Sequence, residues 1–250
     1  MIPVQVQYKV FGRFSLKWNR QLPEKWEECN PRQMQAIGAL YLNAITDARF
    51  IGKMLSIPRF IAKRLDEYLV FSIVSKLEFM EEYGPVDRFI IPKIKKYNAP
   101  KPMLFDVSFG RFMLIDTYYG EYVANRTDES LDKFIAHLYT RGKFTQEGAK
   151  KNIPAFRKVS PEIKFAIVIN YRLVMEWLMA RYPEVFQKSP AAKGKKKVKT
   201  LKKDPGWIKV FDSIVDDDII NSDRYAEKPV HDIFRYLKRK IKENAKRPKI

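Results

Sequence analysis

Cysteine and histidine are nearly absent from this chain of 250 residues. Cys29 is the single cysteine, so no disulfide can form within the chain and no oxidising compartment is required. His137 and His231 are the two histidines, and neither forms a closely spaced ligand pair with Cys29. A zinc site would need Cys29 and both histidines, with no ligand pair at the usual short spacing, and no local signature supports a Cys–His nucleophilic pair. We therefore predict no metal site.

Glycine is also scarce, with ten residues in the whole chain. Neither a Walker-type run nor a GxGxxG motif occurs, so the sequence contains no glycine-rich phosphate loop. Gly110 and Gly120 lie within a helical pattern, which predicts close helix packing at both. The acidic run 216–218 fits no calcium loop and indicates a solvated turn after a helix. We predict no catalytic residue, no cofactor and no enzymatic activity.

Long apolar runs are missing as well. The most apolar stretch, 165–182, is interrupted by Arg172, Glu176 and Arg181, and it is too charged to span a bilayer. The first residues alternate between polar and apolar side chains and lack the basic-then-apolar order of a signal peptide. We expect a soluble, intracellular protein without a membrane span.

Apolar side chains make up 46% of the chain and aromatic ones 14%, which is enough for a large core. Period-two alternation predicts one long or two short strands within residues 1–18. Asn30, Ser56, Thr127 and Ser160 are the predicted helix N-caps, Asp128 being the alternative to Thr127. The spacing of Phe105, Phe109, Phe112, Ile115 and Tyr119 predicts one strongly aromatic helical face. The expected fold is mainly α: a multi-helix bundle with an N-terminal β-strand or hairpin.

Positive charge is present in excess, with a net charge of +19. Residues 188–203 hold eight lysines and no acid, and residues 235–250 hold eight basic residues against Glu243. Because these stretches carry most of the net charge, the body of the protein is close to neutral. Pro, Ala and Gly within the first stretch are typical of a linker. We predict a main helical domain over 1–187, a flexible Lys-rich linker over 188–203, and a small helical hairpin unit over 204–250.

Two other interpretations of the lysine tract stay open. The tract could contact nucleic acid, although it contains no arginine and no aromatic residue for base stacking. It could also contact an anionic membrane surface. The C-terminal helix, which is basic and amphipathic, could dock a protein partner or a membrane. The residues predicted to contact phosphate are Lys195, Lys196, Lys197, Lys202 and Lys203.

Three stretches resemble a known family. They are "LPEKWEECNPRQMQAI" (22–37), "FDVSFGRFMLIDTYYGEYVANRTDESLDKFIAHLYTRG" (105–142) and "GWIKVFDSIVDDDIINSDRYAEKPVHDIFRYLKRKIKEN" (206–244). Together they resemble tail-assembly chaperones of phages and prophages of Bacteroidota. The shared features are packing patterns rather than catalytic motifs.

The resemblance implies a non-enzymatic protein of the bacterial host cytoplasm that assists virion assembly. Such a chaperone would bind apolar helical segments of the tape-measure protein, and tail-tube subunits as well. The alternatives are a nucleic-acid-binding accessory protein and a structural virion component, such as a connector or baseplate part. The residues expected to bind protein partners are Trp26, Phe105, Phe109, Phe112, Tyr119, Trp207, Phe234 and Leu237.

Overall fold

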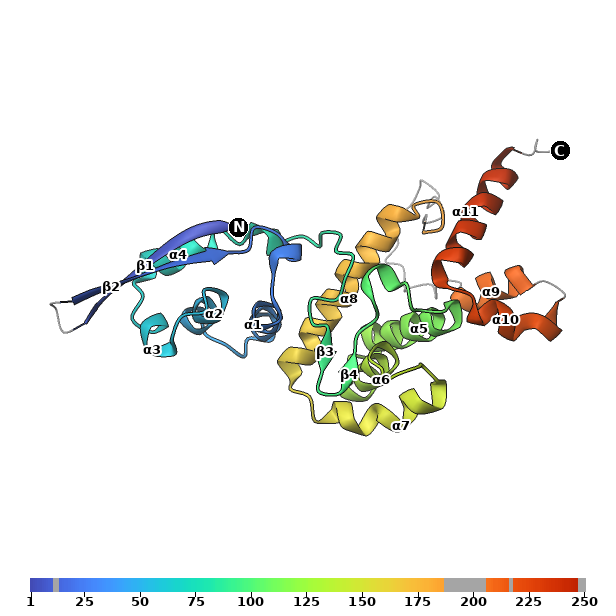
Figure 1. Cartoon of the computed structure of the whole chain (residues 1–250), viewed down its shortest axis with the longest axis horizontal. Coiled ribbons are helices and arrows are strands. Elements are labelled where there is room, and N and C mark those ends of the chain that lie inside the picture. Colours follow the sequence, from blue (N-terminus) through green and yellow to red (C-terminus); the bar gives the residue numbers. More distant parts are fainter. Residues whose placement is uncertain (11–13, 187–205, 216–217, 247–250) are drawn as a thin grey trace, which may run out of the picture. The chain divides into compact units, whose positions relative to one another are not determined.

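The computed structural model describes residues 1–10, 14–186, 206–215 and 218–246. Within these residues the fold is mainly α, with an antiparallel N-terminal hairpin, as the sequence predicts (Figure 1). The chain forms two compact units. Unit 1 contains Met1–Ile94 and Lys158–Trp177, and unit 2 contains Lys95–Arg157 and Leu178–Ile250.

The boundaries of the two units differ from those of the predicted domains 1–187 and 204–250. The C-terminal helices belong to the same compact unit as residues 95–157. Helix α8 (Pro161–Arg181) contributes residues to both units. The predicted linker at 188–203 lies outside the described residues, so its role stays a prediction.

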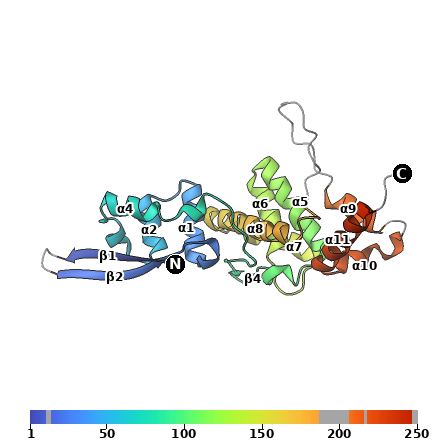
Figure 2. The ribbon, with the colours of Figure 1, turned by 90° about the horizontal axis from the view of Figure 1, so that it is seen from above.

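The N-terminal hairpin consists of β1 (Ile2–Val10) and β2 (Phe14–Leu22). The two strands pair in register from Ile2 opposite Leu22, with Val6 opposite Trp18. Val4, Val6 and Leu22 are buried, as expected for the apolar side of an alternating strand. Figure 2 shows the hairpin extending along one side of the helices of unit 1.

Apart from its share of α8, the helices of unit 1 are short. Asn30 caps the first of them as predicted, because its side chain accepts from the backbone N–H groups of Arg32 and Gln33. In return, the side-chain oxygen of Gln33 accepts from the backbone N–H of Asn30, which completes a capping box. The prediction of a cap at Ser56 was wrong, because this residue has a φ of 53° in the turn before Pro58. The elements in order are η1 (Trp26–Glu28), α1 (Pro31–Tyr41), α2 (Asp47–Met54), α3 (Arg59–Ala62), α4 (Glu67–Val74), η2 (Glu78–Met80) and β3 (Lys93–Ile94).

A close helix crossing and a buried amide hold unit 1 together. A Cβ atom on Gly38 of α1 would lie 2.4 Å from the carbonyl oxygen of Glu162 in α8. Only glycine permits this approach. The buried side chain of Asn170 accepts hydrogen bonds from the backbone N–H groups of Ile90, at 2.6 Å, and Ile91, at 3.3 Å. These bonds attach the irregular segment before β3 to α8.

Unit 2 is built around α5 (Phe109–Asn125), which packs on α6 (Asp128–Leu138). Helix α6 begins after Thr127, whose hydroxyl accepts from the N–H of Ser130, so that predicted cap is confirmed. On its other side α6 packs on α7 (Gln146–Arg157). The remaining elements are β4 (Tyr97–Asn98), η3 (Pro102–Leu104), α9 (Trp207–Val215), η4 (Ile219–Asn221), α10 (Ser222–Glu227) and α11 (Val230–Lys246).

The aromatic helix starts later than predicted. The hydroxyl of Ser108 accepts from the N–H of Arg111 and caps α5 there. Phe105 therefore lies before the helix, after a turn in which Met103 and Leu104 have positive φ. The spacing of Phe105 to Phe109 imitates one helical turn, although the chain between them is not helical.

The two glycines of α5 differ in their surroundings. A Cβ atom on Gly110 would lie 3.1 Å from the Cβ of Ala226 in α10, which confirms the predicted close packing. A Cβ atom on Gly120 would meet nothing within 4 Å, so the same prediction was wrong there.

Candidate partner-binding surfaces

An aromatic cluster joins the C-terminal helices of unit 2 to α5. The ring of Phe112 lies 5.2 Å from that of Trp207 in α9 and 5.3 Å from that of Phe234 in α11, both edge to face. Phe109 lies 6.0 Å from Trp207 in the same arrangement. Edge-to-face pairs at these centroid distances are favourable beyond the area that they bury. Four residues predicted to bind partners thus contact one another.

A hydrogen bond fixes the outer side of this cluster. The indole N–H of Trp207 donates to a carboxylate oxygen of Asp116 on α5, at 3.0 Å. Phe186, which follows α8, lies 5.5 Å from Trp207 and 5.4 Å from Phe234. The sequence did not point to Phe186. Because Phe109, Phe112 and Phe234 are fully buried, the cluster acts as a core of unit 2.

The other predicted partner residues are dispersed. Trp26 is buried in unit 1, where its indole N–H donates to the carbonyl oxygen of Glu82 at 2.8 Å. In unit 2, Tyr119 and Leu237 are half-buried, and the Tyr119 ring packs 5.4 Å from that of Phe134. Phe105 is 64% exposed. The lysines predicted to contact phosphate, Lys195, Lys196, Lys197, Lys202 and Lys203, lie outside the described residues.

His231 attaches α11 to the turn before α5. Its Nε2 donates to the carbonyl oxygen of Met103, and its Nδ1 accepts from the hydroxyl of Tyr182 at 2.8 Å. Both ring nitrogens are therefore occupied in the neutral state. Burial lowers the pKa of His231, and the hydrogen bond to Met103 opposes this only in part. At neutral pH this histidine acts as a structural connector.

Arg111 is a buried cation that the sequence analysis missed. It donates from Nε to the carbonyl of His137 at 3.3 Å and from a terminal nitrogen to the carbonyl of Leu138 at 2.8 Å. Its guanidinium also lies 5.0 Å from the ring centre of Phe144. Burial lowers its pKa to about 10, so it stays charged at neutral pH. A cation at the C-terminus of α6 complements the helix dipole, and the role is structural.

Cys29 is the free cysteine of the chain, and it is buried. Burial raises the pKa of the Cys29 thiol to about 12, which keeps it protonated and unreactive at neutral pH. No group of three or more His, Cys, Asp or Glu that could hold a metal ion occurs in the part of the chain that the structure describes. Among the same residues, no helix is long and apolar enough to cross a membrane.

Helix α4 of unit 1 exposes apolar side chains. Its sequence, EYLVFSIV, contains one buried residue, Ile73. Tyr68 is 82% exposed and Phe71 72%, and Val74 one turn later is exposed too. Contiguous exposed apolar patches on a protein surface mark sites of interaction with partners. The sequence does contain a signal for this surface. The run YLVFSIV has more apolar residues than one buried side of a helix can hold.

A groove of about 690 Å³ continues from the end of α4. Its floor is apolar, with the buried side chains of Phe50 and Leu77. The hydroxyl of Tyr41 donates to the carbonyl of Met80 at 2.7 Å and joins two of its walls. The lining residues are Leu40, Tyr41, Asn43, Asp47, Phe50, Val74, Ser75, Leu77, Glu78, Met80 and Glu81. We refer to this surface, together with Phe71, as the α4 groove.

Known proteins add no assignment to these surfaces: no family model, no curated protein and no solved structure matches this chain.

Proposed function

We propose that this protein is a non-enzymatic assembly chaperone of a phage or prophage tail, acting in the cytoplasm of the bacterial host. It binds apolar helical segments of the tape-measure protein while the tail is built. The observation that supports this proposal is the α4 groove. Helix α4 exposes Phe71 and Val74 beside an apolar floor, and such a surface can bind the apolar face of an amphipathic helix. The aromatic cluster of unit 2 holds the C-terminal helices in place.

The test is co-expression of the full chain with the tape-measure protein of the same phage or prophage, followed by co-purification. We expect a stable complex that survives moderate salt. The variant Phe71→Glu places a charge on the exposed face of α4, one turn before Val74 of the groove lining. It should weaken capture at least tenfold, the effect of losing an interface hot spot of roughly 1.4 kcal/mol or more. Val123→Glu, an exposed apolar position on α5, is the matched control and should capture normally. If the wild-type chain forms no complex under mild salt, the proposal is wrong.

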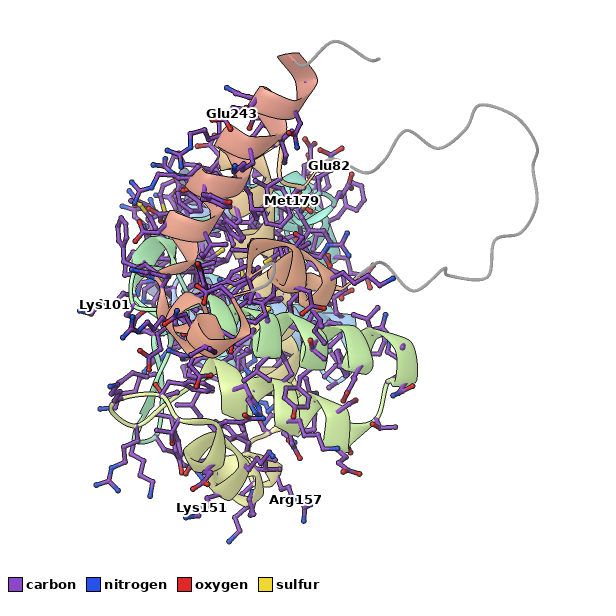
Figure 3. The ribbon with its side chains drawn as sticks, turned by 90° about the vertical axis from the view of Figure 1, so that its right-hand side faces the viewer. Glu82, Lys101, Lys151, Arg157, Met179 and Glu243 are labelled. Atoms are coloured by element: carbon purple, nitrogen blue, oxygen red, sulfur yellow. The ribbon has the colours of Figure 1, made fainter. Side chains whose placement is uncertain are left out.

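A nucleic-acid-binding role is the second candidate, and the exposed cations of α11 favour it: Lys240, and Arg235 and Arg239, which also pair with Asp232 and Glu243 on the same helix. Two other lysines of α11 are engaged: Lys238 and Lys242 each lie 3.3 Å from a carboxylate oxygen of Glu184. Arg239 lies 3.9 Å from Glu243, which Figure 3 labels on the same helix. Phosphate-driven binding should fall steeply between about 50 and about 200 mM salt, whereas capture of an apolar helix should persist.

The third candidate, a structural virion component, differs from the first in where the protein ends up. A connector or baseplate part stays in the purified particle, whereas an assembly chaperone is absent from it. Mass spectrometry of purified particles separates these two roles.

A further inference from the structure

The α4 groove is acidic in a strongly basic protein. The whole chain contains 48 Lys and Arg against 29 Asp and Glu. The lining of the groove includes Asp47, Glu78 and Glu81 and contains no Lys or Arg. All three carboxylates belong to exposed residues, so they border the opening rather than the buried floor. The charged residues that line the groove are thus all acidic, although the protein as a whole is basic.

The apolar part of the groove fits the side chains of a helix. Phe50 and Leu77 form a buried floor, and Val74 of α4 lies on one wall. Phe71, one turn earlier on α4, is exposed beside this wall. A helix bound in such a groove inserts side chains from positions i, i+3 or i+4, and i+7. The residues that flank this stripe on the bound helix would then lie next to the acidic border.

We propose that the α4 groove selects a partner helix whose apolar stripe is flanked by lysine or arginine. This inference rests on the proposed function in one respect, that the client segment is helical, and it adds the chemistry by which that segment is chosen. Cationic flanks meet Asp47, Glu78 and Glu81, whereas acidic flanks place carboxylates against carboxylates. The attraction contributes selectivity and the apolar floor contributes most of the affinity.

The expected selectivity is modest, because exposed ion pairs are individually weak. Three such pairs together correspond to a preference of about tenfold at low salt. Since salt screens exposed charges, the preference should fall to about threefold or less near 0.5 M salt. Affinity for the apolar stripe itself should change little over that range.

The direct test measures binding of two fluorescent peptides to the full chain by anisotropy. Each peptide has about 20 residues, long enough to be helical, with leucines at helical spacing. One carries lysines at the flanking positions, and the other carries glutamates there. We expect the lysine peptide to bind about tenfold more tightly at about 50 mM salt. Equal affinities, tighter binding of the glutamate peptide, or no binding of either peptide would overturn the proposal.

A set of variants assigns the preference to the groove. The triple variant Asp47→Asn, Glu78→Gln, Glu81→Gln should reduce the preference to about twofold and leave the chain folded, as checked by circular dichroism. The control variant Glu121→Gln, Glu147→Gln, Glu227→Gln removes the same charge from exposed positions of unit 2 and should keep the tenfold preference. If both variants lose the preference equally, it arises from overall charge and the proposal is wrong.

Three further outcomes separate this proposal from the proposed function and from self-association. If sedimentation shows a dimer that Phe71→Glu dissociates, and the wild-type chain ignores both peptides, a second copy occupies the groove and the proposal fails. If the lysine peptide is preferred but the tape-measure protein is not captured, the proposed function fails while the groove assignment holds. If the tape-measure protein is captured but neither peptide is preferred, the groove assignment fails while the proposed function holds.

Discussion

Helices α5 and α4 both carry phenylalanine and tyrosine at helical spacing, but these side chains are mostly covered on α5 and exposed on α4. The aromatic face of α5 is covered by Trp207 of α9 and Phe234 of α11, so Phe109 and Phe112 are fully buried. The face of α4 leaves Phe71 in water. Aromatic residues at helical spacing therefore identify an apolar helix face. They do not reveal whether that face packs against the same chain or stays exposed.

The largest expected effect comes from truncating one phenylalanine of the aromatic cluster and one of α4. Phe234→Ala should cost about 3–5 kcal/mol of unfolding free energy, because it leaves a cavity among the rings of the cluster. Phe71→Ala should change stability by less than about 0.5 kcal/mol, as an exposed substitution. Urea unfolding followed by circular dichroism measures both. Similar losses in the two variants would contradict the assignment of α4 as an open face.

A second test compares glycines at covered and open helix positions. Gly38→Ala should destabilise the protein by about 1–3 kcal/mol, because the new methyl group would overlap the backbone of α8. Gly120→Ala should stabilise it by about 0.5–1 kcal/mol, because no atom lies near and alanine favours the helix. Thermal unfolding of the two variants gives the signs, and the same sign for both would argue against the crossing of α1 and α8.

The smallest effect concerns pH and the attachment of α11. The pKa of His231 is lowered in the folded protein, mainly by burial, with Arg181 and Arg235 adding to this and Asp232 opposing it. The unfolded chain therefore binds the proton more readily, so stability is full above about pH 6.5 and falls as the pH drops below that value. His231→Gln should flatten this part of the profile.

The measurement is the unfolding free energy between pH 5 and 8 for the wild type and the variant. His137, whose pKa is also lowered by burial, contributes in the same direction and remains in both proteins. A profile for His231→Gln as steep as that of the wild type would show that the histidine does not titrate on unfolding.

Local features of the fold could be predicted where neighbouring residues decide them. Asn30 and Thr127 cap helices because their side chains reach N–H groups two or three residues away. The hairpin was predictable from alternation in the first strand. Phe105 was misplaced because its spacing to Phe109 fits a helix, and the sequence did not reveal the turn at Met103 and Leu104.

The candidate site depended on contacts between distant segments. The predicted residues Phe109, Phe112, Trp207 and Phe234 do lie together, but as a core, since segments about 100 residues apart cover each other. The α4 groove was not predicted. Its walls come from α1, α2, α4 and η2, and no short stretch of sequence shows how these elements meet.

The sequence alone determined a mainly α chain with an N-terminal hairpin, several of its helix caps and a concentrated positive charge, because composition and local spacing act over a few residues. Only the tertiary structure decided which apolar faces are paired and where acidic residues gather against the charge of the whole. Burial and electrostatic complementarity depend on the side chains that surround a residue in space, most of which are remote in the sequence.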